Sequence, residues 1–183
     1  MKVTLISSSS VENKEYLTLA NEVATYLSNK KYDLIVGGVS SSMMQVIYNK
    51  FKEKNCNITC NTMECYKEDL ICEKTILYAQ TFDRLKATYN DTDIIIALPG
   101  GTGSLAEIFG ILEEIRTLNK ERKLIIYNYK EFYTPILNYI DELIDKGFNK
   151  IEIKDYLIVV NNLDELKKRV SEIYEWFNNG KNS

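Results

Sequence analysis

The sequence predicts a single α/β domain with a Rossmann-like, doubly wound parallel sheet. Short apolar runs alternate with longer segments of helical periodicity, one run is apolar without interruption, and glycines follow two of the runs. The chain has 183 residues, of which 45% are hydrophobic, enough for one sizeable core but short for two ordinary domains. We therefore expect one α/β domain over residues 1–178 and a frayed tail over residues 179–183.

The expected elements follow one another as strand and helix along the whole chain. Asp93–Leu98 is the strongest strand, because its β-branched run is typical of the centre of a parallel sheet. Gly147 suits the end of a helix. The expected strands are Val3–Ile6, Leu34–Val36, Asn57–Asn61, Asp93–Leu98, Lys123–Tyr127 and Tyr156–Val160, and the expected helices are Tyr16–Leu27, Met43–Phe51, Ile76–Tyr89, Ser104–Leu118, Phe132–Lys146 and Leu163–Phe177.

Charge and hydropathy exclude two classes of partner. The formal net charge is −3 and the charges are interspersed, so no basic surface is expected to hold a nucleic-acid polymer. No apolar run is long enough to span a bilayer, and the first run is too short for a signal peptide. We expect a cytoplasmic protein that binds neither a nucleic-acid polymer nor a membrane.

Cysteine and histidine usage limits the chemistry. The cysteines at 56, 60, 65 and 72 do not repeat a C-x-x-C unit, and the chain has no histidine, which favours reduced thiols over a metal site. Without histidine, neither a Ser-His-Asp triad nor imidazole acid–base catalysis is available. We expect carboxylate chemistry, with no metal and no cofactor.

The glycine-rich turn after the strongest strand is the main candidate site. In Pro99-Gly100-Gly101-Thr102-Gly103-Ser104, the missing side chains expose backbone N–H groups at the start of a helix, an arrangement that favours a phosphate. Ser104 and Glu107 also fit a capping box, in which Glu107 would bond back to the helix's own N–H group. Spacing alone leaves both interpretations open. A dinucleotide fingerprint is disfavoured, because that motif belongs at the first strand–helix turn, which here is Ser7–Ser10.

The segment Pro99-Gly100-Gly101-x-Gly103-Ser104-x-x-Glu107 resembles the PGGxGTxxE signature of the LOG (Lonely Guy) family, whose members were long labelled lysine decarboxylases. The resemblance spans nearly the whole chain. Its other matching positions follow in the family's order: Ser8, Tyr16, Ala20, Gly37-Gly38, Met44, Arg84, Asn128, Phe132-Tyr133, Leu137, Ile140-Asp141 and Gly147-Phe148.

The resemblance implies a homodimeric hydrolase of nucleoside 5′-monophosphates that releases the free base and ribose 5-phosphate. It implies Arg84 and Glu107 as the catalytic pair. A carboxylate can stabilise the positive charge that develops on the sugar, whereas an arginine anchors phosphate or polarises oxygens rather than giving a proton. The implied phosphate- and ribose-binding residues are Ser8, Gly37, Gly38, Met44, Gly100, Gly101, Thr102, Gly103 and Ser104. Without the resemblance, Arg84 would be read as a surface arginine paired with a neighbour such as Asp83.

The second glycine turn departs from the family's pattern. Val39–Gln45 lacks the later glycines of GGGxxGLMG, so we expect a different backbone approach to the ligand there. The sequence also leaves two alternative functions open. One is a non-catalytic nucleotide-binding or carrier domain, and the other is a nucleoside deoxyribosyltransferase-like enzyme with a carboxylate nucleophile.

Overall fold

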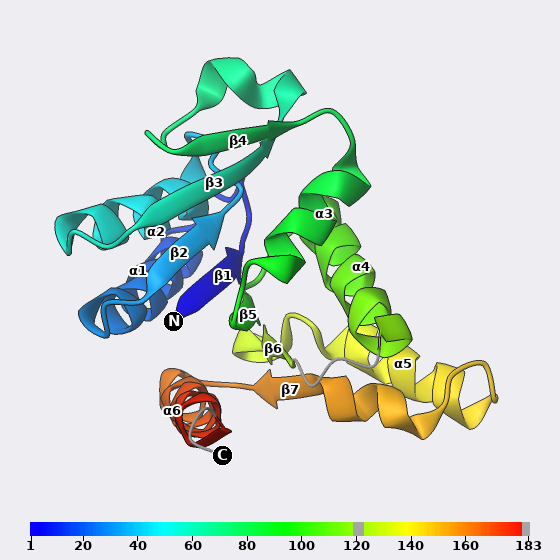
Figure 1. The fold of residues 1–183 in the computed structure, drawn as a ribbon. Helices are drawn as coiled ribbons and strands as arrows, with labels where there is room; N and C mark the ends of the chain where they lie inside the picture. The colour runs from blue at the N-terminus through cyan, green and yellow to red at the C-terminus, as the bar shows by residue number, and fades with distance from the viewer. Residues whose placement is uncertain (119–122, 181–183) are drawn as a thin grey trace.

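A computed structural model describes residues 1–118 and 123–180, and over these residues the strands form one parallel sheet in the order β4-β3-β2-β1-β5-β6-β7 (Figure 1). The chain winds from β1 to β4 in one direction and from β5 to β7 in the other, so the predicted doubly wound fold is confirmed. The elements are β1 (Lys2–Ile6), α1 (Lys14–Asn29), β2 (Asp33–Val36), α2 (Ser42–Glu53), β3 (Ile58–Met63), β4 (Thr75–Tyr78), α3 (Thr81–Asn90), β5 (Ile94–Ala97), α4 (Thr102–Leu118), β6 (Leu124–Tyr127), α5 (Thr134–Asp145), β7 (Leu157–Val160) and α6 (Leu163–Gly180).

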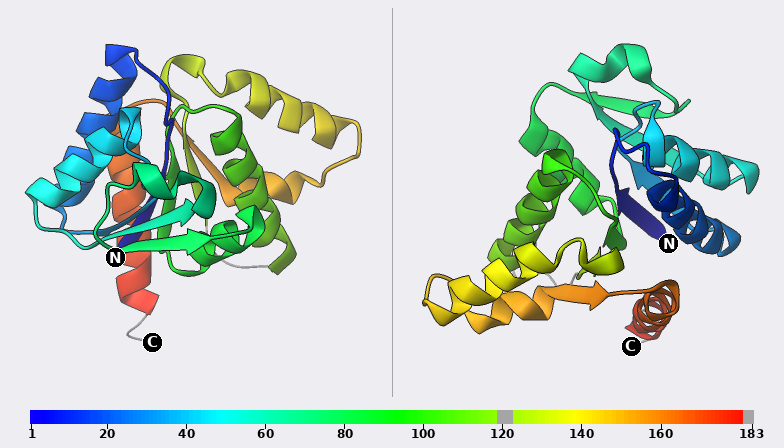
Figure 2. Two further views of the ribbon diagram at one scale, coloured as in Figure 1. Left: turned by 90° about the horizontal axis from the view of Figure 1, so that it is seen from above. Right: turned by 180° about the vertical axis from the view of Figure 1, so that it is seen from behind.

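Helices cover both faces of the sheet. Helices α1, α2 and α6 lie on one face, and α3, α4 and α5 lie on the other (Figures 1 and 2). Each face has its own apolar core: Val23, Leu27 and Phe51 pack in the first, and Ile95, Ile108 and Ile115 in the second. All residues of β5 are buried, which explains the unbroken apolar run, and β5 lies beside the middle strand β1.

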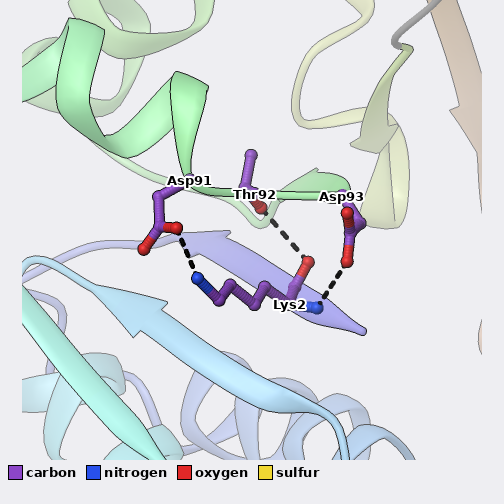
Figure 3. Close-up of polar contacts among 4 residues, drawn as sticks. All are labelled: Lys2, Asp91, Thr92 and Asp93. Atoms are coloured by element: carbon purple, nitrogen blue, oxygen red, sulfur yellow. Dashed lines mark hydrogen bonds and ion pairs between the residues drawn. The ribbon is translucent and has the colours of Figure 1, made fainter.

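The amino ends of β1 and β5 are held together by side chains. The backbone N–H of Lys2 donates to Asp93 Oδ2 at 2.8 Å, Lys2 Nζ pairs with Asp91, and Thr92 Oγ1 donates to the Lys2 carbonyl at 3.3 Å (Figure 3). These contacts fix the register in which Ile6 pairs with Ala97 at the opposite end. The turns that follow β1 and β5 therefore begin side by side.

The prediction of one helix over Ile76–Tyr89 is wrong. Thr75–Tyr78 forms the edge strand β4, which pairs with β3, and α3 begins only at Thr81. Ile76 and Leu77 are 43% and 41% exposed, as an edge strand allows. A four-residue apolar run fits either structure, so only the pairing with β3 decides between them.

Two further expectations need correction. Cys60 and Cys72 are joined as a disulfide with a Cα–Cα distance of 6.0 Å, whereas reduced thiols were expected. The pairing of β3 with β4 brings these two cysteines together, and the sequence could not show that. Helix α6 runs to Gly180, two residues into the expected tail, and residues 181–183 lie outside the described part of the chain. Gly147 has φ +77°, as its predicted place after a helix requires. Within the described residues, no helix is long and apolar enough to cross a membrane.

Candidate active site

Helix α4 begins directly at the glycine turn that follows β5. The N–H of Leu105 donates to the Gly101 carbonyl at 3.0 Å, so Gly101 is the N-cap and Ser104 lies within the first turn of the helix. The capping-box interpretation of Ser104 and Glu107 is therefore wrong: the Ser104 hydroxyl donates to the Ser7 carbonyl at 3.3 Å. The N–H groups of the first turn of α4 are available to a ligand, as are those of many phosphate-binding helices.

The glycines of this turn have different surroundings. A Cβ on Gly100 would lie 2.2 Å from Ser104 Oγ and 2.6 Å from Ser104 Cβ. A Cβ on Gly101 or Gly103 would meet no atom within 4 Å. Gly100 thus allows the turn to pack closely on itself, whereas Gly101 and Gly103 leave open space in front of the helix.

Arg84 and Glu107 form an ion pair at this turn. Arg84 Nη2 lies 2.6 Å from Glu107 Oε1, and their side chains are 14% and 17% exposed. Glu107 projects from α4 one turn after Gly103, and Arg84 comes from the neighbouring helix α3. The surface pairing of Arg84 with Asp83 is thereby ruled out as its main contact, because the carboxylate partner is Glu107.

These residues line a cleft of about 470 Å³ at the carboxyl ends of β1, β2, β3 and β5. Nine of the eleven predicted site residues line it: Ser8, Gly37, Met44, Arg84, Gly101, Thr102, Gly103, Ser104 and Glu107. Two larger hollows, of about 560 and 710 Å³, lie at the amino ends of β2 and β3 and beside β7 and α6. Since ligands of doubly wound sheets bind at the carboxyl ends of the strands, the smaller cleft is the candidate site.

Gly38 and Gly100 do not line the cleft. Gly38 has φ +78°, and a Cβ there would lie 2.5 Å from Cys60 Cβ. Each of the two glycines therefore permits a close packing contact behind the cleft wall. Their predicted role in direct ligand contact is not supported by this placement.

Serine side chains shape the second turn, where the family's later glycines are missing. Ser41 Oγ donates to the Ser9 carbonyl at 2.6 Å, and Ser42 Oγ donates to the Val11 carbonyl at 2.5 Å. Ser42 has φ +51°, a backbone conformation that glycine adopts more easily. The second turn is thus bonded to the segment after β1, and it enters the cleft through Gly37 and Val39.

Sequence reasoning missed about half of the cleft wall. Asn61 and Thr62 lie near the carboxyl end of β3, and Tyr66 lies in the 3₁₀ turn Glu64–Asp69 that follows. The polar pair at the end of a predicted strand was the available signal, but its position depends on the strand order. The missed residues of the cleft are Ser7, Ser9, Ser10, Val39, Asn61, Thr62, Met63, Tyr66 and Thr81.

Tyr133 and Asn128 support the glycine turn from behind. Tyr133 Oη donates to the Leu98 carbonyl at 2.8 Å, and Asn128 Oδ1 accepts from the Tyr133 N–H at 2.7 Å. Burial raises the pKa of Tyr133 far above its usual range, and the charge of Glu107 raises it further. The phenol therefore stays protonated and acts as a hydrogen-bond donor to the turn.

Comparison with known proteins shows which family this chain belongs to. The sequence model of the family described as "Possible lysine decarboxylase", which is the LOG family, matches residues 29–170. The chain belongs to this family. The matched region includes Arg84, Glu107 and the glycine turn between β5 and α4.

Two curated relatives come from Arabidopsis thaliana. Cytokinin riboside 5′-monophosphate phosphoribohydrolase LOG5 is 25% identical over 177 residues, which cover 94% of this chain and 77% of that protein. Cytokinin riboside 5′-monophosphate phosphoribohydrolase LOG1 is 23% identical over 176 residues, which cover 93% of this chain and 83% of that protein. The similarity thus extends over nearly the whole of this chain and over 77% and 83% of the two relatives.

Solved structures with similar folds include two proteins connected with the molybdenum cofactor. The molybdenum cofactor binding protein of Rippkaea orientalis has a TM-score of 0.70 and 12% identity, covering 94% of this chain and 96% of that one. The molybdenum cofactor carrier protein of Chlamydomonas reinhardtii has a TM-score of 0.68 and 13% identity, covering 95% and 98%. At such identity these likenesses show a shared fold and nothing more.

Proposed function

We propose that this protein is a nucleoside 5′-monophosphate phosphoribohydrolase, which hydrolyses the N-glycosidic bond to free base and ribose 5-phosphate. The observation that carries the proposal is the Arg84–Glu107 pair, which lies beside the first turn of α4 in one cleft. A phosphate bound at that turn would bring the attached ribose toward Glu107. Family membership and the names of the Arabidopsis relatives support the same reaction.

Each part of the cleft has a task in this reaction. Breaking the C1′–N bond builds positive charge on the sugar, which the Glu107 carboxylate stabilises while it orients the attacking water. The guanidinium of Arg84 binds anionic or polarised oxygens of the substrate. The N–H groups of the first turn of α4 bind the 5′-phosphate, because they have no partners within the helix.

The proposal extends to the setting of the enzyme. We infer a cytoplasmic homodimer that takes a small nucleotide as its substrate and needs no cofactor. The base is left open, because the serine-bonded second turn and Asn61, Thr62 and Tyr66 give this cleft a wall of its own.

Glu107→Gln tests the proposal. The amide keeps the size of the side chain but cannot stabilise the sugar cation, so kcat for base release should fall by roughly 10²–10⁴-fold. Chromatography of free base from a panel of nucleoside 5′-monophosphates measures this, and calorimetry with ribose 5-phosphate should show binding that is nearly unchanged. Glu113→Gln is the matched control, because Glu113 lies on the same helix and pairs with Arg116 away from the cleft.

The two alternative functions predict different results. A carrier would bind a nucleotide tightly, and neither the unaltered protein nor Glu107→Gln would release base from it. A deoxyribosyltransferase would exchange bases on unphosphorylated deoxynucleosides and hydrolyse little. Absence of free base from every nucleotide in the panel would sink the hydrolase proposal.

A further inference from the structure

A small cavity adjoins the Arg84–Glu107 pair, beside the cleft. Its volume is about 10 Å³, close to the roughly 10–15 Å³ that one water molecule needs. Arg84 and Glu107 line it together with Thr4 of β1, Asn61 of β3 and Thr88 of α3. The cavity thus lies between the sheet and the two helices that carry the ion pair.

Three residues around this cavity each have a buried polar atom with no partner among the described residues. These atoms are Arg84 Nε, Asn61 Oδ1 and Thr4 Oγ1. Asn61 and Thr4 are only 4% and 2% exposed, so bulk water does not serve them. Buried polar atoms are nearly always hydrogen-bonded, and a set of three around one cavity calls for a shared partner.

The chemistry of the three atoms is complementary to a single water molecule. Arg84 Nε carries a hydrogen and can only donate, Asn61 Oδ1 can only accept, and a threonine hydroxyl can accept. The Asn61 amide is oriented by its Nδ2, which donates to Thr88 Oγ1 at 2.9 Å, so that Oδ1 is the free end. A water that accepts once and donates twice would satisfy all three.

These polar residues interrupt an otherwise apolar face. Thr4 precedes Ile6 by two positions on the same face of β1, and the core there contains Ile6, Ile95 and Ile111. Burying a hydroxyl and an amide in such a layer is costly unless both are hydrogen-bonded. Because they line the same cavity as Arg84, they can bind a water molecule beside it, which apolar side chains could not do.

We propose that one water molecule binds in this cavity, accepts from Arg84 Nε and donates to Asn61 Oδ1 and Thr4 Oγ1. Asn61 and Thr4 are then positioning residues for Arg84. Glu107 holds the guanidinium through Nη2 and the water holds it through Nε, so two contacts fix its plane before substrate arrives. The effect on turnover rests on the proposed function, whereas the water site itself does not.

A crystal structure of the unaltered protein, at a resolution that shows ordered waters, tests the site directly. We expect a density peak within hydrogen-bond distance of Arg84 Nε, Asn61 Oδ1 and Thr4 Oγ1. An empty cavity, or a direct bond from Arg84 Nε to Asn61 Oδ1, would overturn the proposal. This result holds whether or not the protein hydrolyses nucleotides, so it separates the failure of the water site from the failure of the proposed function.

A pair of substitutions at Thr4 tests the positioning role. Thr4→Val keeps the shape but removes the acceptor, and it should lower kcat about threefold to tenfold, with KM changed less than about twofold, since one buried hydrogen bond is lost. Thr4→Ser keeps the hydroxyl, so its kcat should equal that of the unaltered protein. Thr92→Val removes an equally buried hydroxyl at the opposite edge of the sheet and should leave kcat unchanged.

Asn61→Leu extends the test to the second acceptor. It should lower kcat about tenfold, because Arg84 Nε then lacks a water bridged to the sheet. In its crystal structure the water peak should be lost and the guanidinium should be rotated or less well ordered. If Thr4→Val has the same kcat as the unaltered protein, the positioning role is wrong even where the water is present.

Discussion

Gly100 and Gly103 lie in the same turn, but a methyl group would meet different surroundings at each. In Gly100→Ala it would lie 2.2 Å from Ser104 Oγ, so the turn must shift, at a cost of roughly 1–3 kcal/mol in unfolding free energy. In Gly103→Ala it would meet no atom within 4 Å, and alanine favours the helix, so stability should stay level or rise by up to about 1 kcal/mol.

Ligand binding should separate the two variants further. The Gly103→Ala methyl occupies the open space before α4, so it should weaken ribose 5-phosphate binding although the fold is intact. Urea denaturation and calorimetry measure the two effects on the same samples. A Gly103→Ala variant that binds ribose 5-phosphate as tightly as the unaltered protein would place the phosphate elsewhere in the cleft.

The residues of the Arg84–Glu107 pair could be predicted from the sequence, but their geometry could not. Arg84 and Glu107 were identified through the family resemblance, because periodicity alone made Arg84 an ordinary surface residue. Their contact depends on α3 packing beside α4, which only the folded chain shows (Figure 1). Asn61 was missed for the same reason, since a polar residue in a strand has no meaning until its neighbours across the sheet are known.

The strand and helix patterns in the sequence predicted the sheet well wherever the hydrophobic pattern of a segment was clear. The apolar run of β5 and the periodic helices around it were placed to within a few residues. The secondary structure between Glu64 and Gln80 was not predicted correctly. The edge strand β4 is short and half-exposed, so its sequence shows neither a clear strand pattern nor a clear helix pattern. The disulfide between Cys60 and Cys72 was not predicted for the same reason, since that bond depends on β3 pairing with β4.

The amino end of α6 is capped by side chains. Asn162 Oδ1 accepts from the Glu165 N–H at 2.9 Å, and Glu165 Oε2 accepts from the Asn161 N–H at 2.8 Å, a reciprocal cap. Asn162→Ala should lower the unfolding free energy by about 1 kcal/mol. Asp164→Asn is the control, because Asp164 lies in the same turn and pairs with the exposed Lys167 rather than with the cap.

Glu165 makes the stability of this cap depend on pH. The backbone N–H of Asn161, followed by the side chains of Asn162 and Asn161, lowers the pKa of Glu165 below its ordinary value of 4.5. A lowered pKa in the folded state means that the stabilisation is complete above the unfolded value and is lost as pH falls through the folded one. The difference in unfolding free energy between the unaltered protein and Glu165→Gln should therefore shrink on acidification. A difference that grows on acidification would contradict the cap.

The doubly wound topology explains why the cleft lies where it does. The chain reverses its direction of winding between β1 and β5, so the turns after these two strands diverge and leave a crevice. The contacts of Lys2 with Asp91 and Asp93 at the far edge hold the two strands in register (Figure 3). Substitutions at that edge should thus act on stability before they act on the cleft.

The expected homodimer has a candidate contact surface on α3 and α4. Phe82 at the start of α3 is 81% exposed and Phe109 on α4 is 41% exposed, and the two helices pack side by side. Aromatic residues exposed to this degree are costly on a free surface and are enriched at interfaces. Arg84 lies two residues after Phe82, so a partner bound there would also restrain the helix that carries it.

Phe82→Glu tests this assignment. Light scattering should give twice the chain mass for the unaltered protein, and the substitution should raise the dimer dissociation constant by at least about tenfold, because a buried phenylalanine contributes roughly 1.5–3 kcal/mol. Phe148→Glu is the matched control, since Phe148 is 78% exposed in the loop after α5, away from α3. If Phe148→Glu dissociates the dimer and Phe82→Glu does not, the dimer contact lies near the loop after α5. The partner chain would then not restrain the helix that carries Arg84.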